Sequence, residues 1–448
     1  MPRMISRLES CPKALARTAG PAYGDHPPDA PDRPFVLASR RQRQIRLRIG
    51  LLGLFGSGNS GNDGSLEAML LFLRRVEPEA ELVCFCASNH GATARVARDF
   101  QLAATPLALP KPAGAVLRIL DRLSFSAPRQ LASMVRAIRH TRRLDLLIVP
   151  GTGILDDFQS GPAGMPLALF GWCLAARLCG TRIAFVSIGA GPIRNSISRW
   201  LMKSAVTMAQ YRSYRDTVSK AFMESIGFDT RNDAVFPDLA FKLPEPASCV
   251  RPDTEDRLLI VGVGVMTYLG WRNGSTLGPE IYAAYLEKIT TFVLWLLNQD
   301  HRVRLLMGHA ADRQAVADVM TKVASARPDL PQDRLLAEPM SSLHDLMRQV
   351  VETDVVVATR FHNVVCALKL CKPTVSIGYA EKFDDLMAEM GVGCFCQHVE
   401  RLDVDLLIEQ FERLTADRRS HENSIRRTNL RYQEYLELQD ELLASRFF

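Results

Sequence analysis

The chain has 448 residues, of which 47% are hydrophobic and 23% are charged, and its formal net charge is +6. This length exceeds what one ordinary core holds, so we expect two domains of a globular protein rather than a disordered or fibrous one. The longest apolar stretch, 163–176, contains Pro166 and ends at Arg177. It falls short of the roughly 18 apolar residues that a membrane-spanning helix needs, so we expect a core helix there.

The first 44 residues contain seven prolines and no apolar periodicity. We therefore interpret 1–44 as a disordered, basic leader. A solvated leader is the plainer interpretation of its charge, and peripheral contact with a membrane surface is the alternative; we expect no nucleic-acid partner. The charge is concentrated where the leader meets the first strand, at Arg40, Arg41, Arg43, Arg46 and Arg48.

The ten cysteines lie in apolar surroundings and form no Cys-x-x-Cys pair. The group Cys394-Phe-Cys396-Gln-His398 lacks a second half-site for a metal ion. We therefore expect reduced thiols, no metal site, and a cytoplasmic protein that is either free or bound at the inner face of the membrane.

From residue 45 onward, apolar strand-like runs alternate with helical patterns, which is typical of a parallel α/β sheet. The first series comprises a strand at 45–55, a glycine-rich turn, a helix at 66–75, and strands at 81–86, 144–149 and 181–188. The segment 237–246 then contains three prolines and loses the apolar period, which indicates a linker.

A second series of strands and helices follows the linker. It comprises a strand at 258–265, a helix at 279–298, a strand at 302–307, a helix at 311–324 and a strand at 353–359. We expect an N-terminal Rossmann-like domain at 45–245, a C-terminal Rossmann-like domain at 246–400, and a helical segment at 401–448.

Three glycine-bearing turns follow three strands of the first series. They are Gly56-Ser-Gly58-Asn59-Ser-Gly61-Asn62-Asp63, Pro150-Gly151-Thr-Gly153 and Ser187-Ile-Gly189-Ala-Gly191. Glycine lets the backbone approach a ligand, and a helix that follows presents amide groups to an anion. One such turn needs no ligand to explain it, but parallel strands end at one sheet edge, so three turns indicate a shared binding surface. The candidate substrate-binding residues here are Gly58, Asn59, Gly61, Asp63, Gly151, Gly153 and Gly189.

Arg215 follows a strand-like run, and the segment 211–219 that contains it precedes a helical pattern that ends at Gly227. Its planar guanidinium suits a carboxylate or a phosphate. The adjacent Asp216 or Thr217 is the type of residue that caps a helix. Asp238 is either a turn-capping residue, part of a hinge between the domains, or part of the side of a site that binds the acceptor.

The run 355–362 is interpreted as a buried strand that ends in Arg360-Phe-His362 and leads into an apolar helix. Side chains alternate along an extended segment, so we expect Arg360 and His362 to leave the strand end on one side. A fixed cation beside a group that titrates near neutrality suits an anionic substrate that must also be protonated. An isolated Arg-x-His is more simply a solvated arginine and a hydrogen-bonded histidine; the companion motifs favour a site.

Taken in order, these motifs resemble the polysaccharide pyruvyl transferase family over about residues 47–393. The matching elements are Gly-x-Gly-Asn-x-Gly with an acid, a glycine turn with Leu-x-Asp, Arg-Asp-x-x-Ser, Asp-x-Ala-Phe, and Arg-x-His with the segment that follows it to Lys382. The chain departs from the family pattern at Asn62, where the family usually has Asp, at Leu239, where it has Pro, and at Phe361, where Leu is common. The first departure leaves an acidic role at that position open.

The resemblance implies two Rossmann-like domains that face a cleft, as in the GT-B architecture. It also implies transfer of a pyruvyl group from phosphoenolpyruvate to two hydroxyls of a sugar in an exopolysaccharide, a cell-surface glycan or its lipid-linked precursor, with no cofactor besides the donor. Such chemistry needs cations for the phosphate and carboxylate, which Arg215 and Arg360 would supply, and an acid for the methylene carbon, which would be His362. Asp238 and Lys382 join the candidate substrate-binding residues.

Two other functions stay open from the sequence. One is a GT-B glycosyltransferase that uses a nucleotide sugar, for which Glu381 is the clearest candidate to hold a ribose. The other is a non-catalytic family member that assists glycan assembly. The sequence also leaves open whether the chain forms a homo-oligomer.

Overall fold

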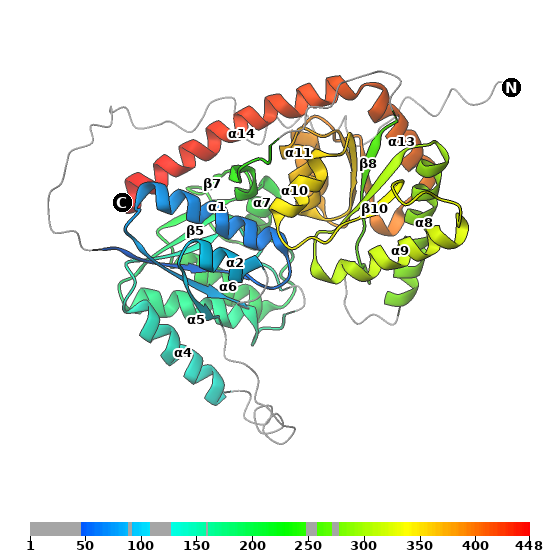
Figure 1. Ribbon diagram of the computed structural model, residues 1–448. Helices are drawn as coiled ribbons and strands as arrows, with labels where there is room; N and C mark the ends of the chain where they lie inside the picture. The colour runs from blue at the N-terminus through cyan, green and yellow to red at the C-terminus, as the bar shows by residue number, and fades with distance from the viewer. Residues whose placement is uncertain (1–45, 88–91, 108–126, 158–159, 248–257, 271–276) are drawn as a thin grey trace. The chain divides into compact units, whose positions relative to one another are not determined.

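The computed structural model describes residues 46–87, 92–107, 127–157, 160–247, 258–270 and 277–448 (Figure 1). These residues divide into two compact units. The N-terminal unit takes the described residues up to Pro244 together with 341–343 and 434–448, and the C-terminal unit takes 245–340 and 344–433. The change of unit at Pro244 falls inside the segment 237–246 that the sequence indicates as a linker. The leader 1–44 lies outside the described residues.

The described part of the N-terminal unit contains a seven-stranded parallel sheet of the order β3-β2-β1-β4-β5-β6-β7. Central strands are buried along most of their length, which is why they read as continuous apolar runs. The edge strands β3 and β7 lack such a run, and the sequence does not indicate them. The strands are β1 (Arg48–Leu52), β2 (Glu81–Cys86), β3 (Ala103–Pro106), β4 (Leu146–Pro150), β5 (Arg182–Ile188), β6 (Tyr211–Tyr214) and β7 (Ala234–Val235).

Helices cover both faces of this sheet (Figure 1). The chain runs from β1 to β3 toward one edge and from β4 to β7 toward the other, so right-handed crossovers place α1 (Ser60–Val76) and α2 (Ala92–Asp99) on one face. The opposite face carries α4 (Ala127–Thr141), α5 (Met165–Leu178), α6 (Ser196–Thr207) and α7 (Thr217–Ser225). Helix α1 begins at Ser60 rather than at Leu66, because its polar first turn shows no apolar period but is capped by Asn59.

The described part of the C-terminal unit contains a six-stranded parallel sheet of the order β10-β9-β8-β11-β12-β13. Both sheets therefore follow the Rossmann strand order, with the direction of the chain reversing between β1 and β4 and between β8 and β11. The strands are β8 (Ile260–Gly264), β9 (Arg302–Leu306), β10 (Leu335–Ala337), β11 (Val355–Ala358), β12 (Thr374–Gly378) and β13 (Cys396–His398). The helices are α8 (Gly278–Asn298), α9 (Arg313–Ala326), α10 (Leu343–Val351), α11 (Phe361–Lys369), α12 (Glu381–Glu389) and α13 (Val404–Ala416).

The long C-terminal helix α14 (Arg418–Phe447) does not form a segment of its own. Its residues up to Gln433 belong to the C-terminal unit, and its residues from Glu434 belong to the N-terminal unit. In the latter, Gln439 is buried and its Nε2 donates hydrogen bonds to Ser187 Oγ at 2.9 Å and Ser213 Oγ at 3.0 Å. None of the helices in the described ranges combines the length and the hydropathy that crossing a bilayer requires.

Candidate functional site

The three glycine-bearing turns of the N-terminal unit meet at the carboxyl ends of the strands, as the sequence predicts. They follow β1, β4 and β5, which are neighbours in the sheet. Ser65 Oγ, in the first turns of α1, donates a hydrogen bond to the Gly151 carbonyl at 3.0 Å, and the Gly189 amide donates to the Thr152 carbonyl at 3.0 Å. The first two turns flank the point where the chain reverses direction in the sheet, which is where doubly wound sheets bind ligands.

Polar side chains hold the first of these turns in place. Asn59 caps α1, and its Oδ1 accepts a hydrogen bond from the Gly61 amide at 3.1 Å. Asp63 is buried and accepts from the Gly56 amide at 2.8 Å and from Thr93 Oγ1 at 2.5 Å. Burial raises the pKa of Asp63, and these two hydrogen bonds oppose that shift without cancelling it.

Asn62, the departure from the family pattern, also binds the turn itself. Its Nδ2 donates to the Leu54 carbonyl at 3.4 Å and contacts Ser57 Oγ at 3.5 Å. Gly58 has φ +90°, a conformation that strongly favours glycine. In this structure Asn62 shapes the turn, and the neighbouring Asp63 is the acid.

Arg215 lies directly after β6, packed over the second and third turns. A Cβ added at Gly189 would lie 2.7 Å from the guanidinium, and one at Gly153 would lie 3.6 Å from it. The guanidinium forms ion pairs with Asp238 at 3.2 Å and with Asp216 at 3.4 Å, and the side chain is only 6% exposed. One cation between two carboxylates leaves a formal charge of −1, so an anion reaches Arg215 only if a carboxylate moves away.

Both carboxylates have a second structural task. Asp216 Oδ1 accepts from the Ser219 amide at 2.6 Å and so caps α7, as the sequence suggests. Asp238 Oδ1 accepts from the Ala240 amide at 3.0 Å and caps a short 3-10 helix, Leu239–Lys242. Asp238 is therefore both a turn-capping residue and the partner of Arg215.

The local structure around Arg360 differs from the sequence expectation. Strand β11 ends at Ala358, Arg360 is the extended N-cap residue of α11, and His362 lies in the first turn of that helix. The two side chains therefore do not alternate along a strand; the expectation of a strand ending in Arg-Phe-His was wrong. The helix takes over because Phe361 and the residues after it pack their apolar side chains on the sheet.

Asp312 holds Arg360 in a two-point ion pair that the sequence analysis did not identify. Arg360 Nη2 lies 2.5 Å from Asp312 Oδ1, and Arg360 Nε lies 3.1 Å from Oδ2. Asp312 is fully buried and also accepts hydrogen bonds from three backbone amides, those of Thr267, Gly308 and His309. Burial alone would lower the pKa of Arg360, but its hydrogen bonds and charge interaction with Asp312 reverse the direction, and the pKa is raised.

Asn363 is a second residue that the sequence analysis missed. It directly follows His362 in α11, is fully buried, and its Oδ1 and Nδ2 have no hydrogen-bond partner among the described residues. A Cβ at Gly308 would lie 2.7 Å from Asn363 Oδ1, and one at Gly264 would lie 3.2 Å from Nδ2, so the amide sits between the loops that follow β8 and β9. Leaving a buried amide unsatisfied is costly, so a water molecule or a ligand is expected to complete its hydrogen bonds, which makes Asn363 a candidate ligand contact.

The ring of Phe361 lies between His362 and Lys382. The His362 ring meets Phe361 edge-on at a centroid distance of 5.4 Å, and Lys382 Nζ lies 5.0 Å from the centroid of the Phe361 ring. Phe383 packs against both Phe361 and Tyr379. The segments after β11 and β12 thus place Arg360, His362 and Lys382 near one another at the carboxyl ends of the C-terminal strands.

His309 adds a titratable group beside this cluster. Its Nδ1 accepts a hydrogen bond from the Ala311 amide at 3.0 Å, and it shares a capping box with Asp312. Burial, followed by the charge of Arg360, lowers the pKa of His309 below its usual value. A neutral His309 leaves the positive charge of Arg360 as the local feature that attracts anions.

Comparisons with known proteins agree with this organisation. A model of the family described as polysaccharide pyruvyl transferase matches residues 59–381, which include residues of both units. No curated protein matches the chain at a significant level.

The similar solved structures establish the fold. A UDP-N-acetylglucosamine 2-epimerase superposes with a TM-score of 0.55 and 13% identity over 89% of this chain and 95% of that chain. The UDP-GlcNAc 2-epimerase from Methanocaldococcus jannaschii gives 0.54 and 11% over 82% and 92%. S. aureus MnaA, solved with UDP, gives 0.51 and 14% over 85% and 91%. The chain has a GT-B-like fold built from two Rossmann-like domains, and identities this low carry no further conclusion.

Proposed function

The chain belongs to the polysaccharide pyruvyl transferase family, and on that premise we propose that it transfers a pyruvyl group from phosphoenolpyruvate to two hydroxyls of a sugar. The acceptor is an exopolysaccharide, a cell-surface glycan or its lipid-linked precursor, and the product is a cyclic pyruvate ketal. The observation that carries this proposal is the family match over 59–381, which covers the first glycine turn from Asn59 onward, the second and third turns, Arg215, Arg360 and His362.

The reaction requires a proton, an anion site and two oxygen nucleophiles. A proton adds to the methylene carbon of the donor, which becomes a methyl group, and positive charge develops at the adjacent carbon. One sugar hydroxyl attacks that carbon, the bond to the phosphate oxygen breaks, and inorganic phosphate leaves. The second hydroxyl then closes the ketal, and both hydroxyls release their protons. Two bonds to sugar oxygens thus replace the bond to the phosphate oxygen and the π bond of the donor.

In this proposal the donor binds to Arg360, His362 and Lys382, which we call the C-terminal cluster. Arg360 keeps a partly exposed guanidinium, 23% by side chain, although Asp312 orients it. It lies at the N-terminus of α11, where backbone amide groups favour an anion. Lys382 adds a second cation nearby, and these charges suit a donor that carries both a phosphate and a carboxylate.

His362 is the group that we assign to protonate the methylene carbon. Histidine is the side chain that ordinarily exchanges a proton near neutral pH, which suits a general acid. His362 also lies in the first turn of the helix that Arg360 caps. His362→Gln keeps a hydrogen-bond donor and removes the titrating group, so we expect kcat to fall about 100-fold or more while KM for the donor changes little. A variant with near-parental kcat and a raised KM would make His362 a binding residue instead.

Ligand-induced stabilisation separates this function from transfer of a nucleotide sugar. A ligand that binds the folded protein raises its melting temperature, and we expect phosphoenolpyruvate to do so while UDP does not. Stabilisation by UDP alone would favour a glycosyltransferase, with Glu381, the first residue of α12, as the candidate contact to a ribose. No stabilisation by either ligand, together with no turnover, would favour a non-catalytic role in glycan assembly.

Mass spectrometry of the host's surface glycan tests the reaction itself. We expect one sugar of the repeat to carry the mass of pyruvate less one water, and to lose it when the protein is absent. Restoring the protein should restore the ketal, and restoring the His362→Gln variant should not. An unchanged glycan in the absence of the protein would contradict the proposed function.

A further inference from the structure

Exposed apolar side chains gather on three adjacent helices of the N-terminal unit, α4, α5 and α6. Among the described residues, the four most exposed large hydrophobic side chains all lie there: Leu178 at 69%, Leu131 at 67%, Trp200 at 61% and Ile197 at 58%. Single exposed hydrophobic residues need no explanation, but a group on neighbouring helices marks an interaction surface.

The three helices form one continuous layer. The rings of Phe170 in α5 and Trp200 in α6 lie 5.6 Å apart, and a Cβ at Gly171 would contact Met134 of α4 at 4.0 Å. Leu131 lies one turn of α4 before Met134, and Ile197 lies one turn of α6 before Trp200. Leu131, Ile197 and Trp200 lie in the N-terminal halves of their helices and Leu178 is the last residue of α5, so the exposed apolar side chains are spread along this helical layer.

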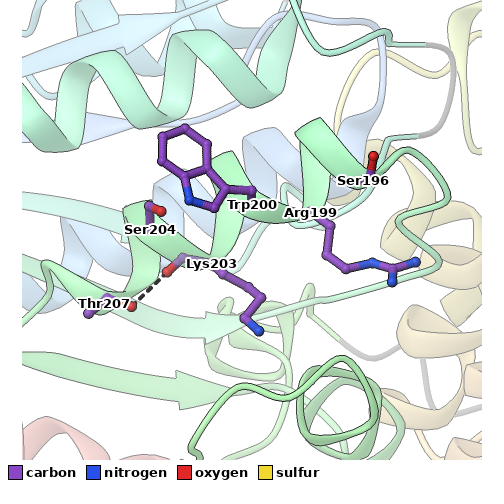
Figure 2. Close-up of a pocket in the computed structure, with 6 residues that line it drawn as sticks. All are labelled: Ser196, Arg199, Trp200, Lys203, Ser204 and Thr207. Carbon is purple, nitrogen blue, oxygen red and sulfur yellow. Dashed lines mark hydrogen bonds between the residues drawn. The ribbon is translucent and has the colours of Figure 1, made fainter.

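Basic side chains flank this apolar strip. Figure 2 shows the indole of Trp200 on one side of α6 and the side chains of Arg199 and Lys203 on the other, around a shallow pocket that Ser196, Ser204 and Thr207 also line. Arg139 and Arg177 are exposed near the C-terminal ends of α4 and α5. We call the surface formed by Leu131, Leu178, Ile197, Trp200, Arg139, Arg177, Arg199 and Lys203 the basic–apolar face.

No acidic side chain neutralises these charges from within the three helices. The sequences of α4, α5 and α6 contain neither Asp nor Glu, whereas α1 and α2 on the opposite face of the sheet contain both signs. Where the cations of this face have partners, these are neutral carbonyls: Arg199 donates to Ile193 and Lys203 to Ile226 and Gly227. The three helices that build the basic–apolar face therefore contribute positive charge and no negative charge.

We infer that the basic–apolar face docks on the surface of an anionic phospholipid bilayer. Tryptophan and aliphatic side chains enter the headgroup boundary, and Lys and Arg at the same level attract anionic lipids. A second copy of this chain would bring like charges together at the same face, which opposes self-association. Nucleic acid would satisfy the charges but would leave Leu131, Leu178 and Ile197 exposed.

This inference does not depend on pyruvyl transfer. A lipid-linked acceptor would be presented at such a surface, but docking would bring a glycan-modifying protein to the membrane whatever its donor. It also differs from contact by the leader, because the basic–apolar face is built by folded helices. Membrane contact by the basic–apolar face and membrane contact by the leader are tested in the same full-length chain.

Vesicle co-sedimentation of the full-length protein provides the test. We expect binding to vesicles that contain phosphatidylglycerol and little binding to pure phosphatidylcholine, with affinity that falls as salt is added. The pair Trp200→Ser with Ile197→Ser should weaken binding about tenfold. The pair Arg139→Glu with Arg177→Glu should weaken it about 30-fold or more. All four positions are exposed, so the melting temperature should not change.

Matched variants on the opposite face of the same sheet provide the control. Leu71→Ser in α1 and Arg98→Glu in α2 change an exposed apolar and an exposed basic residue in the same way, and should leave vesicle binding unchanged. Equal loss in these variants, equal binding to neutral vesicles, or full binding by the Trp200 and Arg177 variants would overturn the inference; the last outcome would assign contact to the leader. A dimer in solution that Trp200→Ser dissociates, without vesicle binding, would also overturn it.

Discussion

Arg215 and Arg360 each follow a parallel strand, but they differ in burial and in the number of carboxylates that surround them. In the N-terminal unit, Arg215 is 6% exposed and lies between the carboxylates of Asp216 and Asp238. In the C-terminal unit, Arg360 is 23% exposed and faces one carboxylate, that of Asp312, which three backbone amides also satisfy.

The difference supports a structural role for Arg215 beside the binding role that we propose for Arg360. Arg215 forms ion pairs with two acids of its own unit, and each of these acids also caps a helix. Asp312 orients the guanidinium of Arg360 but does not fully offset its charge, because three backbone amides also donate hydrogen bonds to the Asp312 carboxylate. An arginine after a strand can thus hold a fold together or present a charge, and only the number and the burial of its partners decide which.

The largest effect that we expect concerns Arg215. Arg215→Ala leaves two buried carboxylates without their cation, so it should lower the free energy of unfolding by about 3–5 kcal/mol. Chemical denaturation monitored by circular dichroism measures this. Adding Asp238→Asn should recover part of the loss, because it removes one uncompensated charge. A parental midpoint for the single variant would contradict the structural role of Arg215.

Arg360→Ala should instead act mainly on the donor. Losing a charge-assisted contact should weaken phosphoenolpyruvate binding by about 2 kcal/mol, measured by calorimetry, with a smaller loss of stability than in Arg215→Ala. Arg313→Ala is the control, because Arg313 is exposed at the start of α9, next to Asp312. Unchanged affinity in Arg360→Ala, or an equal loss in Arg313→Ala, would remove Arg360 from the binding site.

Asn363 tests whether the C-terminal cluster is built for a ligand rather than for stability. Asn363→Leu replaces a buried amide without a hydrogen-bond partner by an apolar group of similar size, so it should raise stability by about 1 kcal/mol or more while lowering turnover. Thermal unfolding and a single-turnover assay measure the two quantities. A variant that is less stable and fully active would show that the amide serves the fold.

The smallest effect that we expect is a pH dependence at Asp63. Burial raises the pKa of Asp63 above its usual value, so the folded state binds this proton more tightly than the unfolded chain. The contribution of the group to stability is present below the unfolded pKa and is lost as pH rises through the folded pKa. Asp63→Asn should therefore lose less stability than the parent as pH rises from about 4 to neutrality. Parallel melting-temperature curves for the two proteins would contradict this.

Helices and strands whose side-chain pattern is continuous along the chain were predictable from the amino-acid sequence. The strand at 81–86 and the helix at 279–298 were predicted close to their observed bounds, because a buried parallel strand and a long amphipathic helix each carry a continuous apolar pattern. The meeting of the three glycine turns also followed from the sequence, since parallel strands end at one edge. Short edge strands such as β3 and β10 have too few buried residues to show a period.

Tertiary structure alone decided which groups face each other across distant segments. Arg360 and Asp312 are far apart in sequence, and nothing in the segment 309–312 indicates a partner 48 residues away. The end of α14 joins the N-terminal unit through Gln439, although its charged sequence indicates only a helix. Arg215 and Arg360 look alike as strand-end arginines, and they differ only in burial and in the number of carboxylates that the fold brings to each. Those quantities depend on packing between segments, which a pattern of neighbouring residues does not contain.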